Sequence, residues 1–148
     1  MLIVCISEAI AEKLARYARD PLIRDLYDLW WYGRNRPLEE DHIRTLWLLK
    51  VYVDYVDEGR WKNKAFDVSS VFSKRNAKNF KFEQIGLYDG KGDPVLWELE
   101  FTARYQFLNS LAANDLTIAN CNPRDRALVT NWIASLSESG QAFPRLSI

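Results

Sequence analysis

The stretch Arg24-Asp25-Leu26-Tyr27-Asp28-Leu29-Trp30-Trp31 decides how this chain folds. We expect it to form a helix whose leucine and tryptophan side chains are buried. Residues three positions apart share a helix face, so Asp25 and Asp28 point the same way. Glu12-Lys13 precedes them on an earlier predicted helix. The sequence therefore predicts a lysine and two carboxylates beside a buried apolar helix face. Such an arrangement is found in catalytic sites and also in ion pairs between packed helices.

The rest of the chain predicts a mainly α fold, with about five to seven helices in a single domain spanning residues 1–148. Ser7 is the expected N-cap of the first helix, and Asp-Pro or Asn-Pro pairs open three others. Gly59 is a natural stop for the third helix. The predicted long helices cover residues 8–18, 21–33, 37–58, 94–113 and 123–139, with short ones at 68–74 and 82–85.

Two of these helices carry a clear apolar face. In the first, the face consists of Ile10, Leu14 and Tyr17, with Lys13 beside it. In the helix predicted at residues 94–113, the face consists of Leu96, Leu99, Ala103, Phe107 and Leu111. We expect both faces to lie in the core, because apolar residues at helical spacing are buried together.

Residues 2–6 are apolar and β-branched, and predict a short N-terminal strand with no obvious partner. An unpaired strand exposes backbone hydrogen-bonding groups. Three arrangements are open to this strand. It could pair with a second copy of the chain as a homodimer through Leu2–Ile6, pair with another polypeptide, or pack as an extended arm.

Composition excludes several classes of protein. The 148 residues are 48% hydrophobic and 27% charged, with a formal net charge of zero, as in a globular protein with no global attraction to nucleic acid or membrane. No apolar run approaches the roughly 20 residues that span a bilayer. The two cysteines predict buried thiols rather than a disulfide framework, and we expect a cytoplasmic protein. The single histidine, His42, has no metal-ligand partner motif.

A resemblance to a known family rests on two segments, Ser7-Glu8-Ala9-Ile10-Ala11-Glu12-Lys13-Leu14 and Arg24-Asp25-Leu26-Tyr27-Asp28-Leu29-Trp30. Together they resemble the C-terminal motif pair of the AbiEii-type abortive-infection nucleotidyltransferases, which are toxins of bacterial toxin–antitoxin systems. The similarity continues through Ile43-Arg44, Leu49-Lys50-Val51-Tyr52, Phe66-Asp67 and Phe82-Glu83-Gln84-Ile85-Gly86.

The resemblance implies roles for the charged residues. Lys13 would contact the phosphates of a nucleoside triphosphate, and Asp28 would be the catalytic carboxylate that accepts or orients the proton of the acceptor hydroxyl. Arg24 and Asp25 would complete the nucleotide site by fixing local geometry. Ordinary ion pairing is the other reading, with Arg24 pairing to Asp28 and either Arg16 or Arg19 pairing to Asp25.

One departure from the family pattern concerns the metal-binding half. Enzymes of this family carry a Gly-Ser or Gly-Gly turn followed by an Asp-x-Asp pair, and neither occurs in the sequence. We therefore expect the C-terminal half of such an enzyme, inactive alone, with no cofactor of its own. Mg²⁺ and a nucleoside triphosphate would bind only when an N-terminal half completes it. An antitoxin is another expected partner. The alternative is a non-enzymatic helical interaction or dimerisation module, or a truncated remnant.

Two further groups are candidates for binding an acceptor. Lys74, Arg75, Lys78 and Lys81, with Phe80 and Phe82 interleaved and Lys62 and Lys64 nearby, could receive RNA phosphates or could form a solvated loop. Trp31 and Tyr32 are the best candidates for exposed aromatic side chains, because Trp30 competes for the same buried space.

Overall fold

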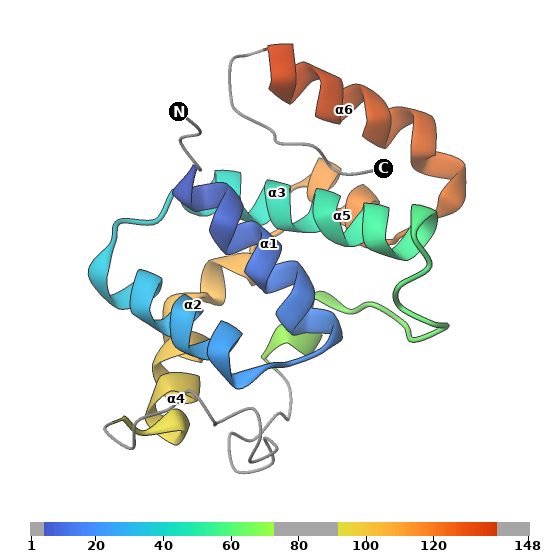
Figure 1. Ribbon diagram of the computed structural model, residues 1–148. Coiled ribbons are helices and arrows are strands. Elements are labelled where there is room, and N and C mark those ends of the chain that lie inside the picture. The colour runs from blue at the N-terminus through green and yellow to red at the C-terminus, as the bar shows by residue number, and fades with distance from the viewer. Residues whose placement is uncertain (1–4, 73–91, 139–148) are drawn as a thin grey trace.

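The computed structural model describes residues 5–72 and 92–138, and this part of the chain contains six α-helices and no strand. It confirms the mainly α fold (Figure 1). The α-helices are α1 (Ile6–Arg19), α2 (Ile23–Asn35), α3 (Glu40–Tyr52), α4 (Pro94–Arg104), α5 (Ala113–Ala119) and α6 (Arg126–Glu138). Single turns of other helix types are η1 (Val53–Asp57), η2 (Val68–Val71), η5 (Gln106–Asn109) and η6 (Pro123–Asp125).

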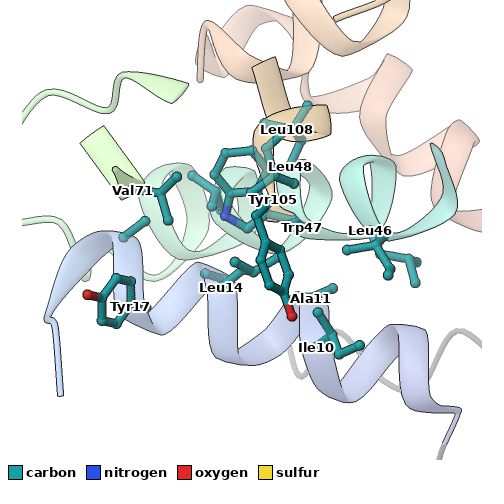
Figure 2. Close-up of a cluster of buried hydrophobic side chains, with 14 of the residues drawn as sticks. Ile10, Ala11, Leu14, Tyr17, Leu46, Trp47, Leu48, Val71, Tyr105 and Leu108 are labelled. Carbon is teal, nitrogen blue, oxygen red and sulfur yellow. The ribbon is translucent and has the colours of Figure 1, made fainter. Parts of the chain in front are cut away.

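The core forms where α1 crosses α3, with α4 and η5 packed behind them. Figure 2 shows α1 contributing one face of this cluster, while Leu46, Trp47 and Leu48 come from α3. The predicted face of the first helix is confirmed, since Ile10, Leu14 and Tyr17 are at most 1% exposed. Burial of these side chains stabilises the fold by about 25 cal/mol for each Å² of apolar surface removed from water.

The start of α1 differs from the prediction. Ile6 is the first residue of the helix rather than the end of a strand, and residues 1–4 lie outside the described part of the chain. Cys5 is the N-cap, because its carbonyl oxygen accepts the N–H groups of Glu8 and Ala9, both at 3.1 Å. Ser7, the predicted cap, is therefore buried inside the first turn.

The helix predicted at residues 94–113 is wrong in both length and buried face. The chain leaves α4 at Tyr105, forms η5 and then starts α5. Leu96 and Leu99 are 45% and 65% exposed, whereas the buried stripe is Trp97, Phe101, Tyr105 and Leu108. The aromatic side chains bury more area than the leucines do, so they determine which face turns inward.

Other predicted boundaries hold in part. The third helix continues through η1 to Gly59, which adopts the left-handed conformation at φ 60° and ends it. Of the helix predicted at 68–74, the structure shows η2. The helix predicted at 82–85 lies outside the described residues. Asn122 caps the turn that leads into α6, because its Oδ1 accepts the N–H of Arg124 at 3.1 Å.

The two thiols and the histidine occupy ordinary positions. Cys121 is buried, and burial raises the pKa of its thiol to about 12, whereas Cys5 is half-buried. His42 is also half-buried, near the start of α3.

A buried ion pair explains why the chain breaks between η5 and α5. Arg44 of α3 donates from Nε to Asp115 of α5 at 3.0 Å, and the two side chains are only 9% and 5% exposed. The same carboxylate accepts the N–H of Ala112 at 3.1 Å. A buried guanidinium needs a countercharge, and Asp115 reaches Arg44 because the chain turns at residues 110–112.

This pair gives a test of the fold. Arg44→Met should lower the free energy of unfolding by about 3 kcal/mol, because it leaves the Asp115 carboxylate buried and without its countercharge. Denaturant unfolding measures the change. The matched control is Arg104→Met, which breaks the exposed pair to Glu40 at 2.7 Å and should cost less than about 1 kcal/mol. Equal losses for the two variants would contradict a structural role for the buried pair.

Candidate functional site

Two ion pairs join α1 and α2, which form an antiparallel helical hairpin (Figure 1). Lys13 Nζ donates to Asp28 Oδ2 at 2.9 Å. Arg16 donates from Nε and Nη2 to the two oxygens of Asp25, at 2.8 and 2.6 Å. Lys13 and Arg16 are three residues apart on α1, as are Asp25 and Asp28 on α2, so the two ion pairs lie about one turn apart on the facing sides of the hairpin. The structure thus brings the predicted lysine and both predicted carboxylates together.

The Arg16–Asp25 pair is a structural contact. Asp25 is fully buried, and both of its carboxylate oxygens are held by the guanidinium in a bidentate geometry. The hydrogen bonds to Asp25 raise the pKa of Arg16. Of the two partners predicted for Asp25, Arg16 is correct. Arg19 instead pairs with Asp54 at 3.2 Å.

The Lys13–Asp28 pair is more accessible. Its two side chains are 24% and 39% exposed, so a ligand can approach from solvent. The pairing of Arg24 with Asp28 is wrong for the described residues, because Asp28 takes Lys13 across the hairpin instead. Arg24, the residue before Asp25, is exposed and has no ion pair within residues 5–72 and 92–138.

Aromatic side chains of α2 lie toward α4. Trp30 lies 5.7 Å from Tyr27 and 5.7 Å from Trp97 of α4, measured between ring centroids. Its indole Nε1 donates to Glu100 at 3.2 Å. Trp31 is 36% exposed, as predicted, and Tyr32 is half-buried. Trp30 therefore helps to fix the contact of α2 with α4, whereas Trp31 contacts Tyr32 and Arg36.

Some predicted binding residues cannot be placed. Lys74, Arg75, Lys78 and Lys81 lie outside the described residues. In the described part of the chain, no three His, Cys, Asp or Glu residues gather as metal ligands. Nor is any described helix long and apolar enough to cross a membrane.

Sequence reasoning missed a second charged cluster near the end of α1. Asp54 of η1 pairs with Arg19 at 3.2 Å and Arg60 at 3.6 Å, and burial raises the pKa of its carboxyl despite these cations. Glu8 and Lys50 pair at 3.6 Å deeper in the α1–α3 contact, and burial likewise raises the pKa of Glu8. The residues are far apart in the sequence, and no local motif signals either cluster.

Comparisons with known proteins identify the family of this chain. The family described as "Nucleotidyl transferase AbiEii toxin, Type IV TA system" matches residues 1–106. The chain therefore belongs to the AbiEii nucleotidyltransferase toxin family. Its fold is similar to that of MenT4, a nucleotidyltransferase toxin from Mycobacterium tuberculosis H37Rv, with 38% sequence identity and a TM-score of 0.83. The match covers 92% of this chain and 46% of MenT4, so the chain spans about half of that protein. No curated protein matches the chain at a significant level.

The two ion pairs of the hairpin should respond differently to substitution. Arg16→Gln should lower the free energy of unfolding by about 3 kcal/mol, because within residues 5–72 and 92–138 Arg16 is the one cation paired to the buried Asp25 carboxylate. Lys13→Gln should change it by less than about 1 kcal/mol, because both partners reach solvent. Thermal and denaturant unfolding of the two variants make the comparison. A large loss in Lys13→Gln would mean that Lys13 is a structural residue.

Proposed function

We propose that this chain is the C-terminal helical part of a nucleotidyltransferase toxin, and that it contributes Lys13 and Asp28 to nucleotidyl transfer from a nucleoside triphosphate to an RNA or protein acceptor. The observation that carries the proposal is the Lys13–Asp28 contact of 2.9 Å at a solvent-accessible position on a rigid hairpin. Side chains this close can act on the same substrate.

The assignment to a C-terminal part rests on the sequence, which lacks both the Gly-Ser turn and the Asp-x-Asp pair of the resembling enzymes. The chain spans 46% of MenT4, which fits a part of a longer enzyme. A second polypeptide segment would carry those residues. On this proposal the chain alone has no transferase activity.

The described residues do not fit a complete magnesium site. Both oxygens of Asp25 are occupied by Arg16, and one oxygen of Asp28 is occupied by Lys13. Mg²⁺ prefers near-octahedral oxygen coordination with one or two free carboxylates. The metal ligands would therefore come from the second segment, and no step is assigned to the metal here.

Four residues of this chain have distinct proposed roles in the reaction. The Lys13 ammonium would exchange its contact with Asp28 for an oxygen of the triphosphate, acting as a point charge. Asp28, released from the lysine, would accept the proton of the acceptor hydroxyl as that oxygen attacks the α-phosphorus and pyrophosphate leaves. Asp25 would act as a positioning residue through Arg16, and Arg24 would approach the nucleotide from the exposed side of α2.

Binding of the acceptor is proposed for the basic segment containing Lys74, Arg75, Lys78 and Lys81. An antitoxin is a proposed partner, in line with the toxin–antitoxin description of the family.

A second candidate function is a non-enzymatic interaction or dimerisation module. The observation that favours it is the exposure of apolar side chains on three helices: Ile6 at 41%, Trp31 at 36% and Leu99 at 65%. Exposed apolar groups of this size are common at contacts between proteins. This reading requires the chain to self-associate or to bind a partner without any contribution from Lys13 or Asp28.

The two candidates are separated by an activity test. The chain would be joined to the segment that precedes it in a related full-length toxin, and incubated with cellular RNA and protein and with nucleoside triphosphates labelled at the α- or γ-phosphate. We expect transfer of the α-label only. Lys13→Gln and Asp28→Asn should each reduce transfer by about 100-fold or more, as expected for loss of a group acting in the transition state.

The matched control is Arg104→Met, which also breaks an exposed ion pair and should transfer at the parental rate. Full activity in Lys13→Gln and Asp28→Asn would refute the proposed site. Absence of any α-label transfer by the joined protein, together with a stable dimer on size-exclusion chromatography with light scattering, would favour the interaction module.

A further inference from the structure

A basic hollow of about 340 Å³ opens between the end of α1 and the loop that follows η1. It lies outside the Lys13–Asp28 contact: Arg19 is six residues beyond Lys13, a rise of about 9 Å along the helix. The hollow is lined by Arg19, Asp20, Arg60, Trp61, Lys62 and Lys64.

The charge of this hollow is unbalanced. It has four cationic side chains, and the carboxylates near it are those of Asp20, Asp54 and Glu58. Arg19 and Arg60 share the single carboxylate of Asp54. Lys62 and Lys64 are exposed and form no ion pair within the described ranges 5–72 and 92–138. An excess of positive charge here is notable because the whole chain has a formal net charge of zero.

The backbone of the loop holds the lysines in place at an energetic cost. Lys62 and Asn63 adopt positive φ values of 48° and 69°, although neither is glycine. Each such residue costs about 1 kcal/mol or more. The turn is closed by the N–H of Lys64, which donates to the carbonyl of Trp61 at 2.9 Å. Strain of this kind persists only where the surroundings impose it, and it is frequent at ligand-binding positions.

Trp61 supplies the anchor for this strained turn. Its side chain is 4% exposed and packs against Phe66 and Tyr55, with ring centroids 5.4 and 6.1 Å away. The ring is therefore too deeply buried to stack on a nucleotide base. The hollow offers a ligand positive charge and N–H donors. They come from two exposed lysines and from two arginines, each of which has N–H groups beyond the one that contacts Asp54.

We propose that this hollow is a phosphate-binding site formed by Arg19, Arg60, Lys62 and Lys64, with Trp61 as its anchor. Two sources of phosphate share this chemistry, namely the polyphosphate of a small molecule and the phosphodiester backbone of RNA. The proposal does not depend on nucleotidyl transfer by Lys13 and Asp28, because it concerns binding alone.

The test measures binding by the intact chain. Fluorescence anisotropy would follow a labelled single-stranded RNA oligonucleotide, and calorimetry would follow inorganic tripolyphosphate, both over a range of salt concentrations. The double variant Lys62→Gln, Lys64→Gln should bind more weakly by about tenfold or more, and its salt dependence for RNA should fall by about one unit of slope per lost phosphate contact. Both substitutions are at exposed positions, so the melting temperature should stay near the parental value.

The matched control removes the same charge elsewhere. Arg36→Gln, Arg124→Gln changes two exposed arginines that do not line the hollow, and it should bind as the parental chain does. Weaker binding of RNA alone would identify the nucleic-acid backbone as the ligand, weaker binding of tripolyphosphate alone would identify a small-molecule polyphosphate, and weaker binding of both would support a site for phosphate from either source. The proposal is overturned if the parental chain binds neither probe, if the lysine variant binds like the parental chain, or if the control loses as much affinity as the lysine variant.

Discussion

The bidentate contact between Arg16 and Asp25 is the constraint on which the candidate site depends. Asp25 is fully buried, so its charge must be matched at short range, and the registration of α1 against α2 does so by placing Arg16 opposite it. Once that registration is set, the residues one turn earlier on α1 and one turn later on α2 face each other. Lys13 and Asp28 occupy these two positions.

The ion pairs of this fold differ mainly in how far their side chains are buried. Arg16–Asp25 joins the consecutive helices α1 and α2, Arg44–Asp115 joins α3 to α5, and the carboxylates of both pairs are shielded from water. Lys13–Asp28 also joins α1 to α2, through one hydrogen bond, but remains half-accessible. A shielded pair resists exchange with a ligand, because separating it exposes a charge to a low-dielectric interior. An accessible pair can exchange one partner for a substrate group at little cost, since water and the new ligand both replace the lost contact.

The positions of the hairpin side chains are held by the helices that pack around them. The α1–α2 hairpin is fixed from behind by α3, to which α1 packs, and by α4, to which α2 packs through Trp30 and Trp97. Side chains on such supported helices hold their positions better than side chains on loops. The hairpin thus presents a lysine and a carboxylate at a set distance, and a second segment would need to supply only the remaining groups of the proposed reaction.

The sequence by itself determined the helices whose periodicity is strong and the identity of the charged residues in the hairpin. Helical spacing places Ile10, Leu14 and Tyr17 on one face whatever surrounds them, and places Asp25 and Asp28 together, because these relations are local. Only the tertiary structure decided which arginine pairs with Asp25, which face of α4 is buried, and that Arg19 and Arg60 meet at Asp54. Each of these depends on contacts between different elements of the fold, where burial and charge compensation outweigh local propensity.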